Sequence, residues 1–137
     1  MIYLDMLKRQ HEEILSILSE IKGIIRSGNL EENAAEAANL ISILAGKLRV
    51  HLNAEDELMY PSLLNSNNPE IRSTAGSFTE EMGNISKVVS DYKERYNTRT
   101  KILTNKYGFA TETENILSML EKRIEKENSI LYPMIKG

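Results

Sequence analysis

An eleven-residue pattern that could supply metal ligands occurs twice in the chain, 72 positions apart. The copies span residues 51–61 and 123–133, and each holds a Glu at its fifth position and a Tyr-Pro pair at its end. Side chains four residues apart lie on one face of a helix, one turn from each other. His51 and Glu55 of the first copy could therefore bind one ion together. The second copy has Arg123 in place of the His, so this half of the site has lost a ligand.

The periodicity of the apolar residues predicts four helices that would carry these side chains. We place them at about residues 3–26, 31–65, 70–97 and 112–132, where apolar residues recur in steps of three and four. No stretch alternates with a period of two for long, which argues against β-strands. We therefore expect an all-α protein, folded as a single antiparallel up-down-up-down four-helix bundle over residues 1–137.

Turn-forming residues mark the ends of the first two helices and the start of the third. The first helix should end at Gly28 and its neighbours, Ser and Asn. Pro61 should bend the second helix or end its main part, because proline cannot donate the next backbone hydrogen bond. Asn68 suits an N-cap, and Pro69 then suits the first helical position.

The segment before the last helix is harder to assign. The residues around 101–103 are apolar enough for a short helix, and Gly108 is expected to break the chain after it. Thr111 and Glu114 have the spacing of a capping box, with Thr111 at the N-cap and Glu114 at N3. This pattern predicts that the last helix begins near residue 112.

Polar side chains interrupt the apolar stripes of the predicted helices. The stripes are Leu7, His11, Ile14, Leu18, Ile21 and Ile25; Ala34, Ala37, Ile41, Leu44, Leu48, His51, Glu55 and Leu58; Ile71, Ala75, Phe78, Met82, Ile85, Val89, Tyr92 and Tyr96; and Ile116, Leu120, Arg123, Glu127, Ile130 and Met134. A charged group that faces a core must be paired or metal-bound, because leaving it without its partner costs about 3–5 kcal/mol. Alternating helix directions bring the polar positions to one end of the bundle, where we expect them to converge.

The residue types at these positions indicate a metal site. Imidazole nitrogen and carboxylate oxygen are ligands for iron, manganese and zinc. His11, His51, Glu55 and Glu127 together could fill four positions on one ion. The sequence contains no Cys, which excludes thiolate ligands and disulfides. We expect Tyr60 and Tyr132, from the two Tyr-Pro pairs, to close the bundle end.

Composition narrows the function classes. A net charge of −3 and a pI of about 5.5 disfavour a nucleic-acid partner. No apolar run approaches the roughly 20 residues of a membrane span, and the start of the sequence lacks a signal-peptide pattern. We expect a cytoplasmic protein. No nucleophile–base pair or phosphate-binding loop is recognisable, so no catalytic residue is assigned and a binding role is favoured over an enzymatic one.

The pattern resembles the hemerythrin-like, or HHE cation-binding, domain across nearly the whole chain. The match consists of His11, the His51–Glu55 pair, Glu127 and the Tyr-Pro that follows each of the last two. The resemblance implies a four-helix bundle around a non-heme di-iron centre. It also implies that one iron takes its histidines from the first and second helices, the other from the third and fourth, and that the two carboxylates bridge them.

The chain departs from this pattern on one side only. Arg123 replaces the expected His of the last helix, and residues 70–97 contain no His. Aligning the apolar stripes of the first and third helices places Met82 opposite His11, and Phe78 one turn earlier. The resemblance then implies a reduced site that holds at most one iron, or another divalent metal, per chain.

Two functional hypotheses remain open at this stage. In the first, the protein binds or senses a metal or a small diatomic ligand through a mononuclear site. In the second, it is a metal-free structural or protein-interaction bundle. Arg123, placed between Glu55 and Glu127, then supplies the charge of the lost metal. The sequence leaves the oligomeric state open.

Overall fold

The computed structural model describes residues 2–135 and is built from helices alone over that range. Its four long helices are α1 (Ile2–Ser27), α2 (Leu30–Leu58), α4 (Pro69–Tyr96) and α6 (Lys106–Lys126), and the short ones are α3 (Tyr60–Leu64) and α5 (Arg99–Thr104). A π-helical turn, η1 (Glu127–Leu131), and a 3₁₀ turn, η2 (Tyr132–Met134), continue directly from α6. The all-α prediction is confirmed.

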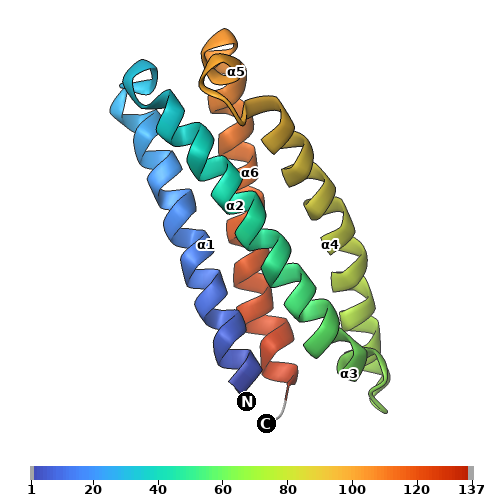
Figure 1. Cartoon of the computed structure of the whole chain (residues 1–137). Coiled ribbons are helices and arrows are strands. Elements are labelled where there is room, and N and C mark those ends of the chain that lie inside the picture. Colours follow the sequence, from blue (N-terminus) through green and yellow to red (C-terminus); the bar gives the residue numbers. More distant parts are fainter. Residues whose placement is uncertain (1, 136–137) are drawn as a thin grey trace.

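The long helices lie alongside one another (Figure 1). In that view α1 and α4 run from the lower end to the upper end, and α2 and α6 run back down. Contacts between side chains tie neighbours together: Glu13 of α1 pairs with Lys47 of α2 at 2.7 Å, and the Tyr92 hydroxyl of α4 lies 2.7 Å from the Thr113 hydroxyl of α6. The C-terminal ends of α2 and α6 therefore lie at the same, lower end of the bundle as the first turns of α1.

Local chemistry explains most of the helix boundaries. Gly28 has φ of +77°, a left-handed conformation that favours glycine, and it separates α1 from α2. The Asn68 side chain accepts a hydrogen bond from the Glu70 backbone N–H at 2.9 Å, and Pro69 follows as the first residue of α4, as predicted. Pro61 lies in the first turn of α3, after α2 has ended at Leu58.

The predicted start of the last helix was wrong, because a different residue caps it. α6 begins at Lys106, and the Asn105 side chain accepts the Gly108 N–H at 3.1 Å. Gly108 is thus part of the first turn rather than a break, and a Cβ there would overlap the Asn105 side chain. Thr111 and Glu114 lie inside the helix. The expected short helix near 101–103 is confirmed as α5, which also begins at a capping side chain, that of Thr98.

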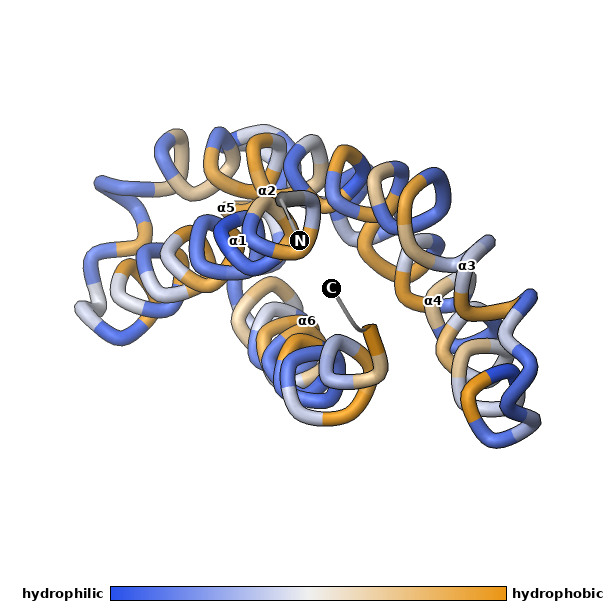
Figure 2. The backbone as a smooth tube through the Cα atoms, turned by 90° about the horizontal axis from the view of Figure 1, so that it is seen from below, coloured by the Kyte–Doolittle hydropathy of each residue, from blue (hydrophilic) through white to orange (hydrophobic). Residues whose placement is uncertain are grey.

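Two separate clusters of apolar side chains form the core. The larger cluster fills the middle and upper part of the bundle and includes Ile14, Leu52, Met82 and Ile124. The smaller one closes the lower end and consists of Leu7, Met59, Tyr60, Leu63, Ala75, Phe78, Leu131 and Tyr132. In the view from below (Figure 2), hydrophobic and hydrophilic residues alternate along every long helix, as expected for helices with one buried face.

Two residues assigned to the buried stripes are exposed instead. Leu58 is 44% exposed and Ile130 is 43% exposed, whereas the next residue in each case, Met59 and Leu131, is completely buried. Both shifts follow from irregular backbone. α2 ends at Leu58, and the π turn η1 inserts one additional residue into the last helix, which moves the buried face forward by one position.

Candidate metal centre

A layer of buried polar side chains separates the two apolar clusters. His11 comes from α1, His51 and Glu55 from α2, and Glu127 from η1, and each of the four side chains is at least 98% buried. In each helix the polar position lies between residues of the larger and the smaller cluster. One nitrogen or oxygen atom from each of the four lies within 4.8 Å of the others. The structure thus brings together the four residues that the sequence singled out as metal ligands.

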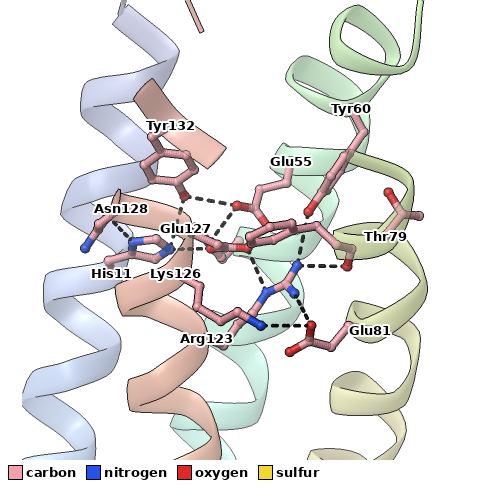
Figure 3. A network of polar contacts seen from close by, with 12 residues as sticks. His11, Glu55, Tyr60, Thr79, Glu81, Arg123, Lys126, Glu127, Asn128 and Tyr132 are labelled. Atoms are coloured by element: carbon pink, nitrogen blue, oxygen red, sulfur yellow. Dashed lines mark hydrogen bonds and ion pairs between the residues drawn. The ribbon is translucent and has the colours of Figure 1, made fainter. Parts of the chain in front are cut away.

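Glu127 lies between the two imidazole rings. Its Oε1 atom is 2.7 Å from His11 Nε2 and 3.5 Å from His51 Nε2. His51 Nε2 also lies 3.3 Å from Oε2 of Glu55, one helical turn along α2. Figure 3 shows the labelled His11, Glu55 and Glu127 side chains pointing toward one another from three helices. The Nε2 atoms of both rings therefore face the same two carboxylates.

The other nitrogen of each imidazole is held by an amide. His11 Nδ1 lies 2.9 Å from Oδ1 of Asn128, and His51 Nδ1 lies 2.8 Å from Oε1 of Gln10. An amide oxygen only accepts, so Nδ1 is the N–H donor in both rings. In a neutral imidazole this leaves the Nε2 lone pair directed at the carboxylates, which is the arrangement that histidine ligands require.

These two amides were not recognised from the sequence. Each is a neighbour of a predicted ligand: Gln10 precedes His11 in α1, and Asn128 follows Glu127 in η1. Only the folded arrangement shows that Gln10 serves His51 of the other helix. Both amide residues also line surface grooves: Gln10 lines a groove between α1 and α2, and Asn128 lines one between α1 and α6. The buried histidines are thus one side chain away from the surface.

Tyr132 is a further polar contact that sequence reasoning did not assign to the site. It is buried in the smaller cluster at the bundle end, as expected, but its hydroxyl donates to Glu55 Oε2 at 3.0 Å and lies 3.1 Å from His11 Nε2. Burial and the two nearby carboxylates raise the pKa of the phenol above its usual range, so it is a neutral donor in the metal-free protein. The Tyr-Pro at the end of both repeats was the signal that could have indicated it.

Arg123 points into the bundle and is 3% exposed. Its Nε donates to Glu127 Oε2 at 3.2 Å, and its Nη2 donates to the Phe78 carbonyl at 2.9 Å and to the Tyr60 hydroxyl at 3.2 Å. The guanidinium lies over the Phe78 ring, 4.4 Å from its centroid. Nη1 reaches Glu81 at 3.5 Å, near the edge of the bundle. Arg123 therefore pairs with Glu127, one of the two carboxylates between which the sequence placed it, and none of these contacts involves Glu55.

The electrostatics of the layer follow from these contacts. Burial lowers the pKa of His51, but hydrogen bonds to Glu127 and Glu55 outweigh burial and raise it to about 9. Burial raises the pKa of Glu127, but its hydrogen bonds with His11 and His51 dominate and hold it well below the usual carboxyl range. Burial raises the pKa of Glu55. In the metal-free protein at neutral pH, the proton of His51 thus compensates part of the carboxylate charge.

Two features of the layer fit a bound metal ion. The donors are imidazole nitrogens and carboxylate oxygens, which suit iron, manganese or zinc. Oε1 of Glu55 is buried and has no hydrogen-bond partner among the described residues, although an unpartnered buried carboxylate oxygen is costly. An ion bound by Glu55 would supply the missing partner, so the residues present fit a metal on the His11 and His51 side.

Met82, the other position where we expected a substituted ligand, lies in apolar surroundings. It is 8% exposed and belongs to the larger hydrophobic cluster, with Ile85 and Val89 of the same helix. Its assignment to a lost ligand position stays a prediction. No helix within residues 2–135 has the length and apolar character needed to cross a membrane.

Comparison with known protein families agrees with this geometry. The model of the hemerythrin HHE cation-binding domain matches residues 3–135, nearly the entire chain. The chain belongs to the hemerythrin family. No curated protein and no solved structure gives a significant match. Within this hemerythrin-family chain, a buried group of His and Glu lies where three of the four long helices meet, and Arg123 adjoins it on the side facing α4.

Proposed function

We propose that this protein is a cation-binding four-helix bundle of up-down-up-down topology that holds one metal ion per chain. His11, His51, Glu55 and Glu127 are the proposed ligands. The observation that carries the proposal is the closeness of their donor atoms, which lie within 4.8 Å of one another in a layer screened from solvent. Within residues 2–135, one oxygen of Glu55 in this layer has no hydrogen-bond partner.

Iron is the metal we propose first. The donor set contains nitrogen and oxygen but no thiolate, and membership of the hemerythrin family favours a cation in this layer. Bound iron would supply a Lewis-acidic, redox-active centre. The chain's own residues orient its ligands through Gln10 and Asn128, exclude water with the two apolar clusters, and fix Glu127 through Arg123.

A single ion per chain is proposed because the other side of Glu127 has no vacant ligands. Oε2 of Glu127 faces the guanidinium of Arg123, which is always charged. The neighbouring α4 presents the ring and carbonyl of Phe78 there. A second cation would have to displace Arg123 and would find no imidazole.

The proposed role is binding or sensing, either of the metal itself or of a small diatomic ligand at the metal, rather than catalysis. The two histidines lie one amide away from surface grooves, which gives a short path for an ion or a small molecule. The lining of these grooves by charged side chains such as Glu13 and Lys47 does not favour a large apolar ligand. We propose no nucleic-acid or membrane partner, and an oligomer is compatible with this role.

A metal-free structural or interaction bundle is the second candidate. It is favoured by the contacts of Arg123, which already neutralises Glu127, and by the raised pKa of His51, which lets a proton compensate the second carboxylate. The guanidinium of Arg123 and the proton of His51 then offset carboxylate charge in the layer. The fold could therefore persist without an ion.

Metal analysis of protein purified without chelator separates the two candidates. We expect about one equivalent of iron or another divalent metal per chain, because one set of four ligands is present. Glu55→Gln should lose the metal, whereas Glu57→Gln, an exposed carboxylate in the same helix, should keep it. Metal-free protein that fails to take up iron, manganese or zinc at micromolar concentration would favour the second candidate. Two tightly bound equivalents would contradict a mononuclear site.

A further inference from the structure

We infer that the phenol oxygen of Tyr132 is a fifth ligand of the proposed ion, and that it makes the site selective for iron(III). This inference rests on the proposed function. It concerns a residue outside the group of histidines and carboxylates that the sequence indicated.

Five polar atoms, one from each of the proposed ligands, form a closed ring. Starting from His11 Nε2, the ring passes to Glu127 Oε1 at 2.7 Å, to His51 Nε2 at 3.5 Å, to Glu55 Oε2 at 3.3 Å and to the Tyr132 hydroxyl at 3.0 Å. It closes from that hydroxyl back to His11 Nε2 at 3.1 Å. Without Tyr132, the gap between His11 and Glu55 would be left open.

The sizes of these steps match those between ligands of one ion. Nitrogen and oxygen ligands bind zinc at about 2.0–2.2 Å, so two ligands at a right angle lie about 2.8–3.1 Å apart and two at a tetrahedral angle about 3.3–3.6 Å. All five steps of the ring fall between 2.7 and 3.5 Å. The phenol oxygen therefore lies at the distance expected between two ligands of one ion, both from the carboxylate Oε2 of Glu55 and from the imidazole Nε2 of His11.

The backbone of the second repeat explains how Tyr132 reaches this position. Tyr60 and Tyr132 both follow a Glu by five residues. In the first copy the Met59 N–H bonds back to Glu55, α2 ends, and the Tyr60 hydroxyl contacts Arg123. In the second copy the Tyr132 N–H bonds to the Glu127 carbonyl, which closes the π turn and directs the phenol at the donor ring.

The identity of the fifth ligand decides which oxidation state the site prefers. With iron(II) and a neutral phenol, the two carboxylates, Arg123 and the metal sum to a charge of +1. With iron(III), the O–H bond of Tyr132 breaks, its proton passes to the solvent, and the oxygen's electron pair binds the metal. The sum remains +1, so the phenolate offsets the third charge of the metal. A hard, anionic oxygen ligand thus stabilises iron(III) more than a divalent ion.

Spectroscopy of the iron-loaded protein tests this directly. Metal-free protein is loaded with iron(III) supplied as its nitrilotriacetate complex, and the small-molecule iron is removed by gel filtration. We expect a visible phenolate-to-iron charge-transfer band, with tyrosine ring vibrations enhanced in the resonance Raman spectrum. Tyr132→Phe should lose the band and weaken iron(III) binding more than zinc(II) binding. Tyr60 is the matched buried tyrosine of the first repeat, and Tyr60→Phe should keep both the charge-transfer band and the affinity for iron(III).

The outcomes distinguish this inference from the proposed function. Iron bound by the wild type without a phenolate signature would overturn the tyrosine ligand and leave the four-residue site standing. A band that survives Tyr132→Phe, or disappears only in Tyr60→Phe, would also overturn it. If the wild type binds neither iron nor zinc, the proposed function and this inference both fail. The wild-type Raman spectrum is decisive even if a variant folds poorly.

Discussion

The two oxygens of Glu127 face opposite environments. Oε1 lies among His11, His51 and the ring of atoms closed by Tyr132, whereas Oε2 accepts from Arg123 beside the Phe78 ring. Both environments are buried and both compensate the same carboxylate. On the first side the compensating charge can be exchanged, because it is a proton on an imidazole or a bound ion. On the second side it is fixed, because a guanidinium does not lose its proton.

This difference suggests how a two-metal arrangement can be reduced to one. The family resemblance implies carboxylates that bridge two irons, and Glu127 here bridges a candidate metal position and a guanidinium. Arg123 thus supplies, from the chain itself, the positive charge that a second metal would supply on that side of Glu127.

Removing Arg123 should be the most destructive change. Arg123→Ala leaves Glu127 Oε2 without its counter-charge in a buried layer, and we expect a loss of about 3–5 kcal/mol in the free energy of unfolding. Chemical denaturation of the metal-free protein measures it. Lys126→Ala is the matched control: Lys126 shares Glu81 with Arg123 but is half exposed, so its loss should cost less than about 1 kcal/mol. Equal stabilities of Arg123→Ala and the wild type would mean that the guanidinium does not compensate the layer.

The exchangeable proton of His51, on the Oε1 side of Glu127, should make the stability of the metal-free protein fall at alkaline pH. The pKa of His51 is raised from 6.5 to about 9 in the fold, so its contribution is fully present below pH 6.5 and is lost as the pH rises through 9. Integrated over this shift, the loss amounts to about 3 kcal/mol. Denaturation in the presence of chelator at a series of pH values measures it.

His51→Gln, which has no proton to lose, is the control for this pH effect and should show a nearly flat profile over the same range. Metal affinity of the wild type should change in the opposite direction and rise with pH, because the imidazole must be deprotonated to bind. Stability of the wild type that increases between pH 6.5 and 9 would contradict the assignment.

The amides that hold the histidines should matter for the metal more than for the fold. Gln10→Leu and Asn128→Leu each remove the acceptor of an Nδ1–H, and we expect metal affinity to fall roughly 10- to 100-fold for each. Competitive titration with a chromophoric chelator measures this. Gln10→Glu, which restores an acceptor oxygen, should recover most of the affinity. An unchanged affinity in both Leu variants would show that the histidine rings are held by packing alone.

The proposed ligands that lie on regular helices could be predicted from the sequence. His11, His51 and Glu55 lie on stripes whose period of 3.6 residues holds throughout α1 and α2, so their burial followed from spacing. The N-cap at Asn68 was also predictable, because a local side chain and Pro69 both favour it. These features depend on residues within one turn of each other.

The features that depend on tertiary contacts or on irregular backbone could not be predicted from the sequence. The π turn at η1 shifts Ile130 outward and brings Tyr132 to the site, and a strict helical period cannot anticipate an additional residue in one turn. Gln10 serves a histidine 41 positions away, a pairing that no local spacing reveals. The misplaced start of α6 has a different cause: Thr111 and Asn105 both have capping chemistry, and the Tyr92 contact with Thr113 favours a helix that has already begun.

The smallest effect should come from replacing Arg123, the fixed charge beside Glu127 Oε2, by a histidine, whose charge can be exchanged. Arg123→His returns an imidazole to the position four residues before Glu127 and removes the permanent charge, so metal affinity should rise about tenfold, or about 1.4 kcal/mol. A second equivalent should still not bind tightly, because α4 contains no His, and Glu81, the α4 carboxylate that contacts Arg123, is 43% exposed and also pairs with Lys126. Isothermal titration with zinc(II) gives both the affinity and the stoichiometry, and Arg123→Gln, uncharged but a poor ligand, separates loss of charge from gain of a ligand. If Arg123→His and Arg123→Gln bind zinc equally well, removal of the guanidinium alone accounts for the change. If Arg123→His binds two equivalents, the side facing α4 retains more of a metal site than its residues indicate.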